Sequence, residues 1–281
     1  MIIHVQASTI YRRLFAGLIW IALGGSLAAN YCQARRAQAL PFSAGEELLY
    51  QAEFTRGPLR GVNVGDLRFN VSDSVGSNGR EQKLIGDAVG KGFLLKLFGS
   101  QFHLHVESNL LLQPFTVLRT SKLDEERKRV RFSEATFDHE TRRAIWSDRD
   151  PTKSQTPTST TVTFTEPVQD ILTVIYFMRT RHLEPGQSFD IPLVDGGHLY
   201  RFSVAVMERK KMKTAVGRVD VLRIEPSMFG DQGLVRGRGT LSIWITEDVR
   251  HIPVKAQIKV PAGTFDIKLK QVTNRKDEIH H

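Results

Sequence analysis

Two histidines have a spacing at which side chains can share a ligand. His103 and His105 flank Leu104, so on a strand both rings would lie on one face, close enough to bind one metal ion. A zinc site needs a third protein ligand, and no residue near them in the sequence stands out as that ligand. We therefore interpret both as surface or core histidines and predict no metal site.

Acidic and basic side chains follow one another in a dense run. The run comprises Asp124, Glu125, Glu126, Arg127, Lys128, Arg129 and Arg131. Its opposite charges compensate each other, which is typical of a solvated strand or turn. The chain contains no nucleophile elbow, phosphate loop, dinucleotide fingerprint or zinc-protease helix. We predict a protein that is not an enzyme and has no catalytic residues and no cofactor. The alternative is a hydrolase of envelope glycans or lipids, built from acids or histidines that only the fold brings together.

Two apolar features could bind a lipid-like ligand. Residues 92–99 begin and end with glycine and hold a single charge, so they predict a loop that exposes apolar side chains, or else a buried strand or short helix. Trp244 falls opposite Ile243 and Ile245 in an alternating run, so it either lines an internal cavity or packs under a helix. The predicted ligand-binding residues are Phe93, Leu94, Leu97, Phe98 and Trp244.

Four lysines recur at outward positions of neighbouring predicted strands. They are Lys255, Lys259, Lys268 and Lys270. Such a basic face could contact an envelope protein or an anionic membrane or cell-wall surface. The alternative is ordinary solvation and protection of a sheet edge.

The elements that must position these residues are mostly strands. Apolar and polar residues alternate over 241–245, 254–260 and 265–269, which predicts a three-stranded antiparallel meander. Asp195, Gly196 and Gly197 predict a hairpin turn between strands at 189–194 and 199–206. Further short strands are expected at 130–137 and 142–146, and two around the turn at 216–218.

One internal segment, 168–181, has helical spacing of its apolar residues, and Pro167 suits its first turn. Residues 147–160 are rich in Pro, Ser and Thr and predict a polar internal loop. The predicted fold class is mainly β: a single antiparallel curved sheet, a half-open barrel or spiral, with one internal helix at about 168–181. We expect one such domain over residues 41–274.

The first residues differ from the rest of the chain. Arg12 and Arg13 precede an apolar run at 14–23 and a small, polar stretch at 24–30, which predicts a signal peptide over 1–34, cut after Ala28 or Ala34. An uncleaved anchor in the inner membrane is the alternative, but the apolar run is shorter than the roughly twenty residues of a spanning helix. Residues 1–39 hold four arginines and no acid, so the net charge falls from +9 to +5 without them.

Many short motifs in a fixed order resemble one bacterial family. They are Pro41-Phe42, Gly45-Glu46 and Tyr50; Gln169-Asp170 through Tyr176 and Arg179; Ile191-Pro192, Asp195-Gly196-Gly197 and Tyr200; and Gly237 through Trp244, Asp248, Pro253, Lys259-Val260 and Gly263. With them the chain resembles the family catalogued as domain of unknown function 3108. The resemblance implies exported Gram-negative envelope proteins, a curved sheet partly closed around a helix, and no catalytic residues. Its fold-level likeness is to periplasmic carriers of lipids or lipoproteins.

These observations favour a non-enzymatic, exported periplasmic or envelope protein that binds an apolar, lipid-like ligand or an envelope partner. A structural or scaffolding protein of the cell envelope is the alternative, beside the hydrolase. Export makes nucleic acid a poor partner. The sequence leaves the ligand and the oligomeric state open.

Overall fold

A computed structural model describes residues 40–76, 79–91, 102–126, 129–154, 156–231 and 233–274. The chain divides into two compact units, Met1–Ala39 and Leu40–His281, and the described residues belong to the second. The predicted signal peptide lies outside them.

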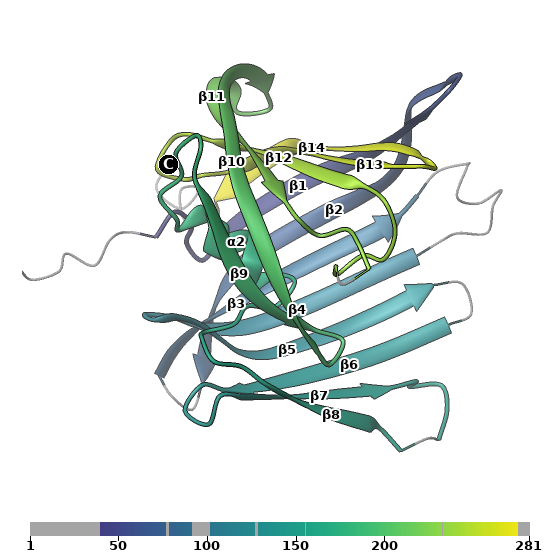
Figure 1. Ribbon diagram of the computed structural model, residues 1–281, viewed down its shortest axis with the longest axis vertical. Helices are drawn as coiled ribbons and strands as arrows, with labels where there is room; N and C mark the ends of the chain where they lie inside the picture. Colours follow the sequence, from purple (N-terminus) through teal and green to yellow (C-terminus); the bar gives the residue numbers. More distant parts are fainter. Residues whose placement is uncertain are drawn as a thin grey trace, which may run out of the picture. The chain divides into compact units, whose positions relative to one another are not determined.

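The described unit is built from strands and one short helix, labelled in Figure 1. The strands are β1 (Glu46–Arg56), β2 (Leu59–Gly76), β3 (Gly79–Gly90), β4 (Phe102–Leu112), β5 (Phe115–Glu126), β6 (Arg129–Asp138), β7 (Arg143–Arg149), β8 (Thr158–Thr163), β9 (Ser188–Asp195), β10 (His198–Thr214), β11 (Gly217–Pro226), β12 (Thr240–Thr246), β13 (Pro253–Val260) and β14 (Gly263–Asn274). The helix is α2 (Thr173–Arg179).

All fourteen strands belong to one sheet. Its order is β8-β7-β6-β5-β4-β3-β2-β1-β14-β13-β12-β11-β10-β9, and neighbouring strands are antiparallel throughout. Two meanders therefore extend in opposite directions from the central pair β1–β14. The predicted fold class, one curved antiparallel sheet of the half-open barrel kind with an internal helix, is confirmed.

Alternating burial explains why these segments are strands. In β6, Ser133, Ala135 and Phe137 are buried whereas Glu134 and Thr136 are exposed. Residues that alternate in this way present one face to a core and the other to water. We call the face directed at α2 the inward face.

The two edge strands of the sheet, β8 and β9, approach each other without pairing. The segment before α2 pairs with β9 instead: Gln169 N–H donates to Pro192 O (2.9 Å), and Val194 N–H donates to Gln169 O (2.9 Å). At the β9–β10 turn, a side chain at Gly197 would lie 3.1 Å from Thr160 of β8. We call this junction of β8, β9 and the segment before α2 the seam.

The helix α2 is shorter than the predicted segment 168–181. Its start is delayed because Gln169 is held in an extended bridge to β9, and Asp170 Oδ1 accepts the backbone N–H groups of Leu172 (2.8 Å) and Thr173 (2.6 Å). The helix ends where the Thr180 N–H returns to Phe177 O. No helix in the described part of the chain is long and apolar enough to cross a membrane.

The core is centred on α2, which lies between the two meanders (Figure 1). Val174 and Met178 pack against a cluster from β9 to β12, including Ile191, Leu193 and Ile224. On the other side, Leu172 and Tyr176 pack in a cluster with Phe42, Val71, Leu84, Val106 and Leu110. Since a fully buried aliphatic side chain contributes about 1.5–3 kcal/mol, this contact with both halves stabilises the sheet around the helix.

Two boundaries differ from the sequence interpretation. The polar loop predicted at 147–160 spans only 150–157, because its ends continue β7 and β8. The two short strands expected around 216–218 are the end of β10 and the start of β11. The strand β10 passes through the charged residues 208–211, which are exposed, so hydrophobic alternation could not reveal its length.

Candidate functional site

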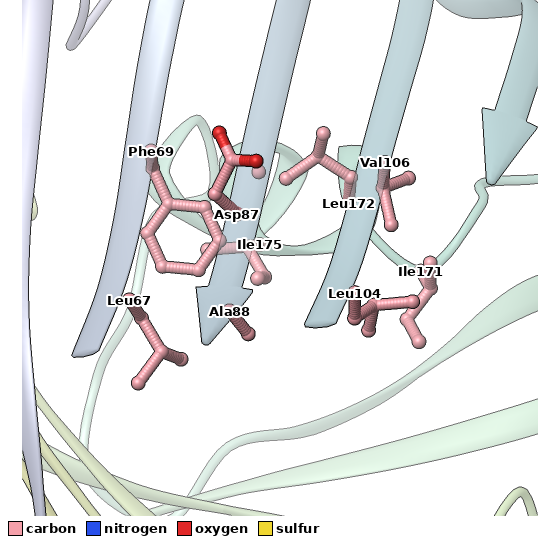
Figure 2. Close-up of a pocket in the computed structure, with 10 residues that line it drawn as sticks. Leu67, Phe69, Asp87, Ala88, Leu104, Val106, Ile171, Leu172 and Ile175 are labelled. Atoms are coloured by element: carbon pink, nitrogen blue, oxygen red, sulfur yellow. The ribbon is translucent and has the colours of Figure 1, made fainter. Parts of the chain in front are cut away.

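An apolar pocket of about 150 Å³ lies between the inward face of β2–β4 and the segment that begins α2. Figure 2 shows its side chains converging from three strands and from this segment. The lining residues are Leu67, Phe69, Gly86, Asp87, Ala88, Leu104, Val106, Ile171, Leu172 and Ile175. The volume is similar to that of engineered apolar cavities that take up benzene, so it can hold part of a hydrocarbon chain.

The register of three strands creates this hollow. Phe69, Gly86 and Val106 lie directly opposite one another across β2, β3 and β4, and so do Leu67, Ala88 and Leu104 in the next row. In each row the middle strand carries the smallest side chain. A Cβ at Gly86 would lie 3.2 Å from Leu172 Cδ1 and 3.4 Å from the Phe69 ring, so glycine is what allows Leu172 to approach the sheet.

Two buried polar anchors hold α2 over the pocket. At its start, Asp170 Oδ2 accepts the hydroxyls of Ser108 (2.6 Å) and Thr120, from β4 and β5. At its end, Arg179 forms a bidentate ion pair with Glu46 at 2.6 and 2.8 Å. Both carboxylates thus receive donors in a region where an unpaired charge would be costly.

Arg179 is also enclosed by backbone acceptors and aromatic rings. Its guanidinium donates to Pro41 O (2.8 Å) and Arg250 O (3.1 Å) and lies 5.4 Å from the Phe42 ring centre and 5.2 Å from that of Tyr176. Burial opposes its charge, but the hydrogen bonds and charge of Glu46 outweigh burial and raise the pKa of Arg179. Burial also raises the pKa of the nearby Tyr176 hydroxyl.

Beyond Leu104 the inward face becomes charged. Asp124 of β5 lies directly opposite Leu104, and Arg131 of β6 directly opposite Asp124. Lys122, Asp148 and Asp195 join them through ion pairs or electrostatic contact. We call these five residues the charged strip. An apolar pocket and a charged strip are therefore neighbours on one face of the sheet.

Most charges of the strip are already paired. Arg131 donates to Asp148 through Nε (3.1 Å) and Nη2 (2.5 Å), and Lys122 Nζ lies 2.6 Å from Asp195 Oδ1. Burial would raise the pKa of Asp148, but hydrogen bonds from Arg131 and Ser133 outweigh it and hold the pKa below its ordinary value. Asp148 therefore stays ionised near neutral pH and is poorly suited to act as a general acid.

Of the predicted ligand-binding residues, the structure describes Trp244, which does not line this pocket. Phe93, Leu94, Leu97 and Phe98 fall outside the described residues. Trp244 is 6% exposed and packs in a cluster with Val221, Ile252 and Val254, with Lys210 and Lys255 ammonium groups 4.7 and 5.0 Å from its ring centre. It is not among the residues that line the pocket.

The predicted basic face carries acids as well as lysines. Lys255 pairs with Asp266 (2.7 Å), whereas Lys268 (2.6 Å) and Lys270 (3.9 Å) share Glu53. Lys259 makes no ion pair with any described residue. Two carboxylates thus face four lysines, so the charge of the face is compensated in part. The sequence could not indicate the contribution of Glu53, because Glu53 lies on a strand from the other end of the chain.

The two histidines are held by carboxylates of adjacent strands. His103 Nδ1 lies 2.9 Å from Glu125 Oε2, and His105 Nδ1 lies 2.7 Å from Asp87 Oδ1. In the described part of the chain, no group of three or more His, Cys, Asp or Glu side chains is arranged to hold a metal ion.

Sequence reasoning missed the residues of the pocket itself. The signal that could have found them is the pair Gly86 and Ala88, two small residues at alternating positions of one strand. Small residues at such spacing indicate that something approaches the strand closely on that face. Only the register of β2, β3 and β4, however, shows which large side chains surround them.

The fold and the pocket define a class: barrel-like β proteins in which one incompletely closed sheet surrounds a short helix. Within it, the chain belongs to the family described as protein of unknown function (DUF3108), whose model matches residues 49–270. No curated protein matches the chain.

The solved structures that match this chain are very distant from it in sequence. A β-barrel-like protein of the DUF1849 family from Brucella abortus is 9% identical, with a TM-score of 0.51, covering 81% of this chain and 96% of that one. A Bacteroides fragilis protein described as a candidate exported protein with a YmcC-like fold is 8% identical (TM-score 0.33, 83% and 97% covered). A candidate lipoprotein of Parabacteroides distasonis is 9% identical (TM-score 0.30, 83% and 97% covered). The first of these likenesses shows the fold alone.

Proposed function

We propose that this protein is an exported, non-enzymatic envelope protein that binds an apolar, lipid-like ligand in the pocket beneath α2. One observation carries the proposal: the pocket is lined mainly by apolar side chains from three strands and the start of the helix, with Asp87 as the charged residue of the lining. Leu67, Phe69, Ala88, Leu104 and Ile175 are only partly buried, so the lining is accessible from solvent. Concave, mostly apolar sites of this kind are typical of binding sites for small apolar ligands.

Export is proposed from the N-terminal sequence. Arg12 and Arg13, the apolar run 14–23 and the small residues that follow have the order of a signal peptide. An envelope compartment would place the protein beside lipids, which supply ligands of the proposed kind.

The test is a substitution that fills the pocket with a larger side chain. Ala88 lies in the centre of one row of lining residues, so Ala88→Phe would place a phenyl ring in the hollow. We expect this variant to bind the neutral dye N-phenyl-1-naphthylamine at least about tenfold more weakly than the wild-type protein, because the ring occupies the volume that the dye needs. Dye fluorescence titrated with protein measures the difference.

Val89→Phe is the matched control. Val89 is the next residue of β3, is not among the pocket-lining residues and lies on the opposite face. It should leave dye binding unchanged, and thermal unfolding of both variants shows whether each is folded. Equal dye binding by Ala88→Phe and the wild-type protein, or no binding by either, would overturn the proposal. Native mass spectrometry of protein recovered from the periplasm then identifies any co-purified lipid.

A further inference from the structure

We infer that the ligand is an amphiphile with an ammonium head group, whose chain enters the apolar pocket and whose head lies at Asp124. This inference rests on the proposed function and names the class of ligand for the same site. It follows from the place where the pocket ends and the charged strip begins, and from which charge in the strip has no partner among the residues that the structure describes.

The geometry places the two parts of such a ligand side by side. Leu104 lines the pocket, and Asp124 is its direct neighbour across the β4–β5 register. Residues directly opposite in an antiparallel pair project to the same face, with Cβ atoms about 4.5–5.5 Å apart. A chain end lodged against Leu104 therefore leaves its polar head within reach of Asp124 without crossing the sheet.

The charges of the strip select the sign of the head group. Lys122 pairs with Asp195, and Arg131 pairs with Asp148 through Nε and Nη2. Asp124 acts electrostatically on Arg131 but forms no hydrogen bond or ion pair with any described residue, and its side chain is exposed. The strip thus holds three carboxylates against two cations, and the one charge without an ion-pair partner among the described residues is a carboxylate.

An ammonium head supplies what this arrangement lacks. Its N–H groups donate to carboxylate oxygens, and its charge neutralises the surplus negative charge. A carboxylate or phosphate head would instead meet Asp124 with like charge. The net charge of the whole chain is +9, so non-specific attraction favours anions, and a preference for a cationic amphiphile must come from the local site.

The experiment compares three ligands with the same chain: dodecylamine, dodecanol and dodecanoate, each displacing N-phenyl-1-naphthylamine from the full protein at neutral pH. We expect dodecylamine to displace the dye at concentrations about fivefold lower than dodecanol, as for one exposed ion pair, with dodecanoate the weakest. Added salt should reduce this preference because it screens exposed charges.

Asp124→Asn is the diagnostic variant, and Glu125→Gln is its matched control on the neighbouring outward position of β5. Asp124→Asn should abolish the preference for dodecylamine over dodecanol while dodecanol binding stays the same, and Glu125→Gln should retain the preference. If dodecanol displaces the dye but dodecylamine shows no advantage, or if Asp124→Asn keeps the advantage, the head-group inference is wrong and the pocket stands. If none of the three displaces the dye, or the dye does not bind, both proposals fail.

Discussion

At the scale of single residues, a row of alternating acids and bases crosses the outward face of β3–β5. His105 lies between Asp87 (2.7 Å) and Glu107 (3.4 Å), and Glu107 also pairs with Lys83 (2.7 Å). Burial alone would lower the pKa of His105, but the two carboxylates outweigh burial and raise the pKa above its ordinary value of 6.5. The ring therefore binds its proton more tightly in the folded protein than in the unfolded chain.

This shift predicts the sign of a pH dependence. Because the pKa of His105 is higher in the folded state, its contribution to the free energy of unfolding is fully present below a pH of about 6.5 and is lost as the pH rises through the folded-state value. We expect His105→Gln to reduce the loss of stability between pH values of about 6 and 9. Urea unfolding at a series of pH values measures it.

His182→Gln provides the comparison for this prediction. His182 has 80% of its side chain exposed, and its ion-pair partner among the described residues is the exposed Glu184, so its replacement should leave the pH dependence nearly unchanged. If the free energy of unfolding changes with pH in the same way in His105→Gln and in the wild-type protein, His105 is not the source of this pH dependence.

At the scale of elements, α2 depends on its anchors. A helix of seven residues is too short to be stable in water by itself, so its position comes from packing and from Asp170 and Arg179. Its amphipathic pattern predicted a helix here. Its bounds and anchors could not be predicted, because Glu46 and Arg179 are 133 positions apart, and no local pattern relates an acid at the first strand to an arginine at the helix end.

The buried ion pair between Arg179 and Glu46 predicts a large effect on stability. Arg179→Met should lower the free energy of unfolding by about 3–5 kcal/mol, because it leaves Glu46 buried without its partner. The double variant Arg179→Met with Glu46→Met should recover much of this loss, since it removes the unpaired charge. Urea unfolding of the two variants measures both effects.

The double variant also decides between two explanations. If it is as unstable as Arg179→Met alone, the loss comes from the backbone acceptors and aromatic contacts of Arg179 instead of from the charge left on Glu46. An Arg179→Met protein as stable as the wild type would contradict both.

At the scale of the whole molecule, the seam is the place where the two edge strands of the sheet come together. Gly196 and Gly197 both have positive φ, +58° and +75°, but a side chain at Gly196 would meet nothing within 4 Å, whereas one at Gly197 would press on Thr160 of β8. A substitution at Gly196 therefore affects the backbone of the turn alone, whereas one at Gly197 also affects the contact with β8.

Gly196→Ala should cost about 1–2 kcal/mol, the usual penalty of a left-handed backbone for a residue with a Cβ. Gly197→Ala should cost more, and it alone should speed amide hydrogen exchange in β8. Urea unfolding with hydrogen exchange by mass spectrometry measures the difference. Equal costs and unchanged exchange in β8 would show that the approach of Gly197 to Thr160 does not hold the seam.

The sequence predicted individual strands, turns and the helix, but not which of them contact one another in the fold. Alternation located β12, β13 and β14, and Asp195 to Gly197 located the β9–β10 turn, because both signals are short-range. The pocket depends on the register of β2, β3 and β4 and on their contact with residues 171–175, which lie far from these strands in the sequence. We interpreted the charged run that begins at Asp124 as a solvated strand or turn, but its neighbouring acids lie on opposite faces of β5. Asp124 is directed inward beside the pocket, and Glu125 is directed outward beside His103.

The position of β1 beside β14 at the centre of the sheet has a consequence for the order of assembly. One edge of β1 pairs with its neighbour in sequence, β2, but the other edge pairs with β14, where Glu46 lies opposite Asn274. That second edge cannot pair until the last strand is available, whereas each meander can form from local hairpins. Such long-range pairings are slow to form because the closing loop is large. A chain delivered from one end must therefore keep the edge of β1 unpaired throughout synthesis or transport, the interval in which it is most open to aggregation or to capture by a chaperone.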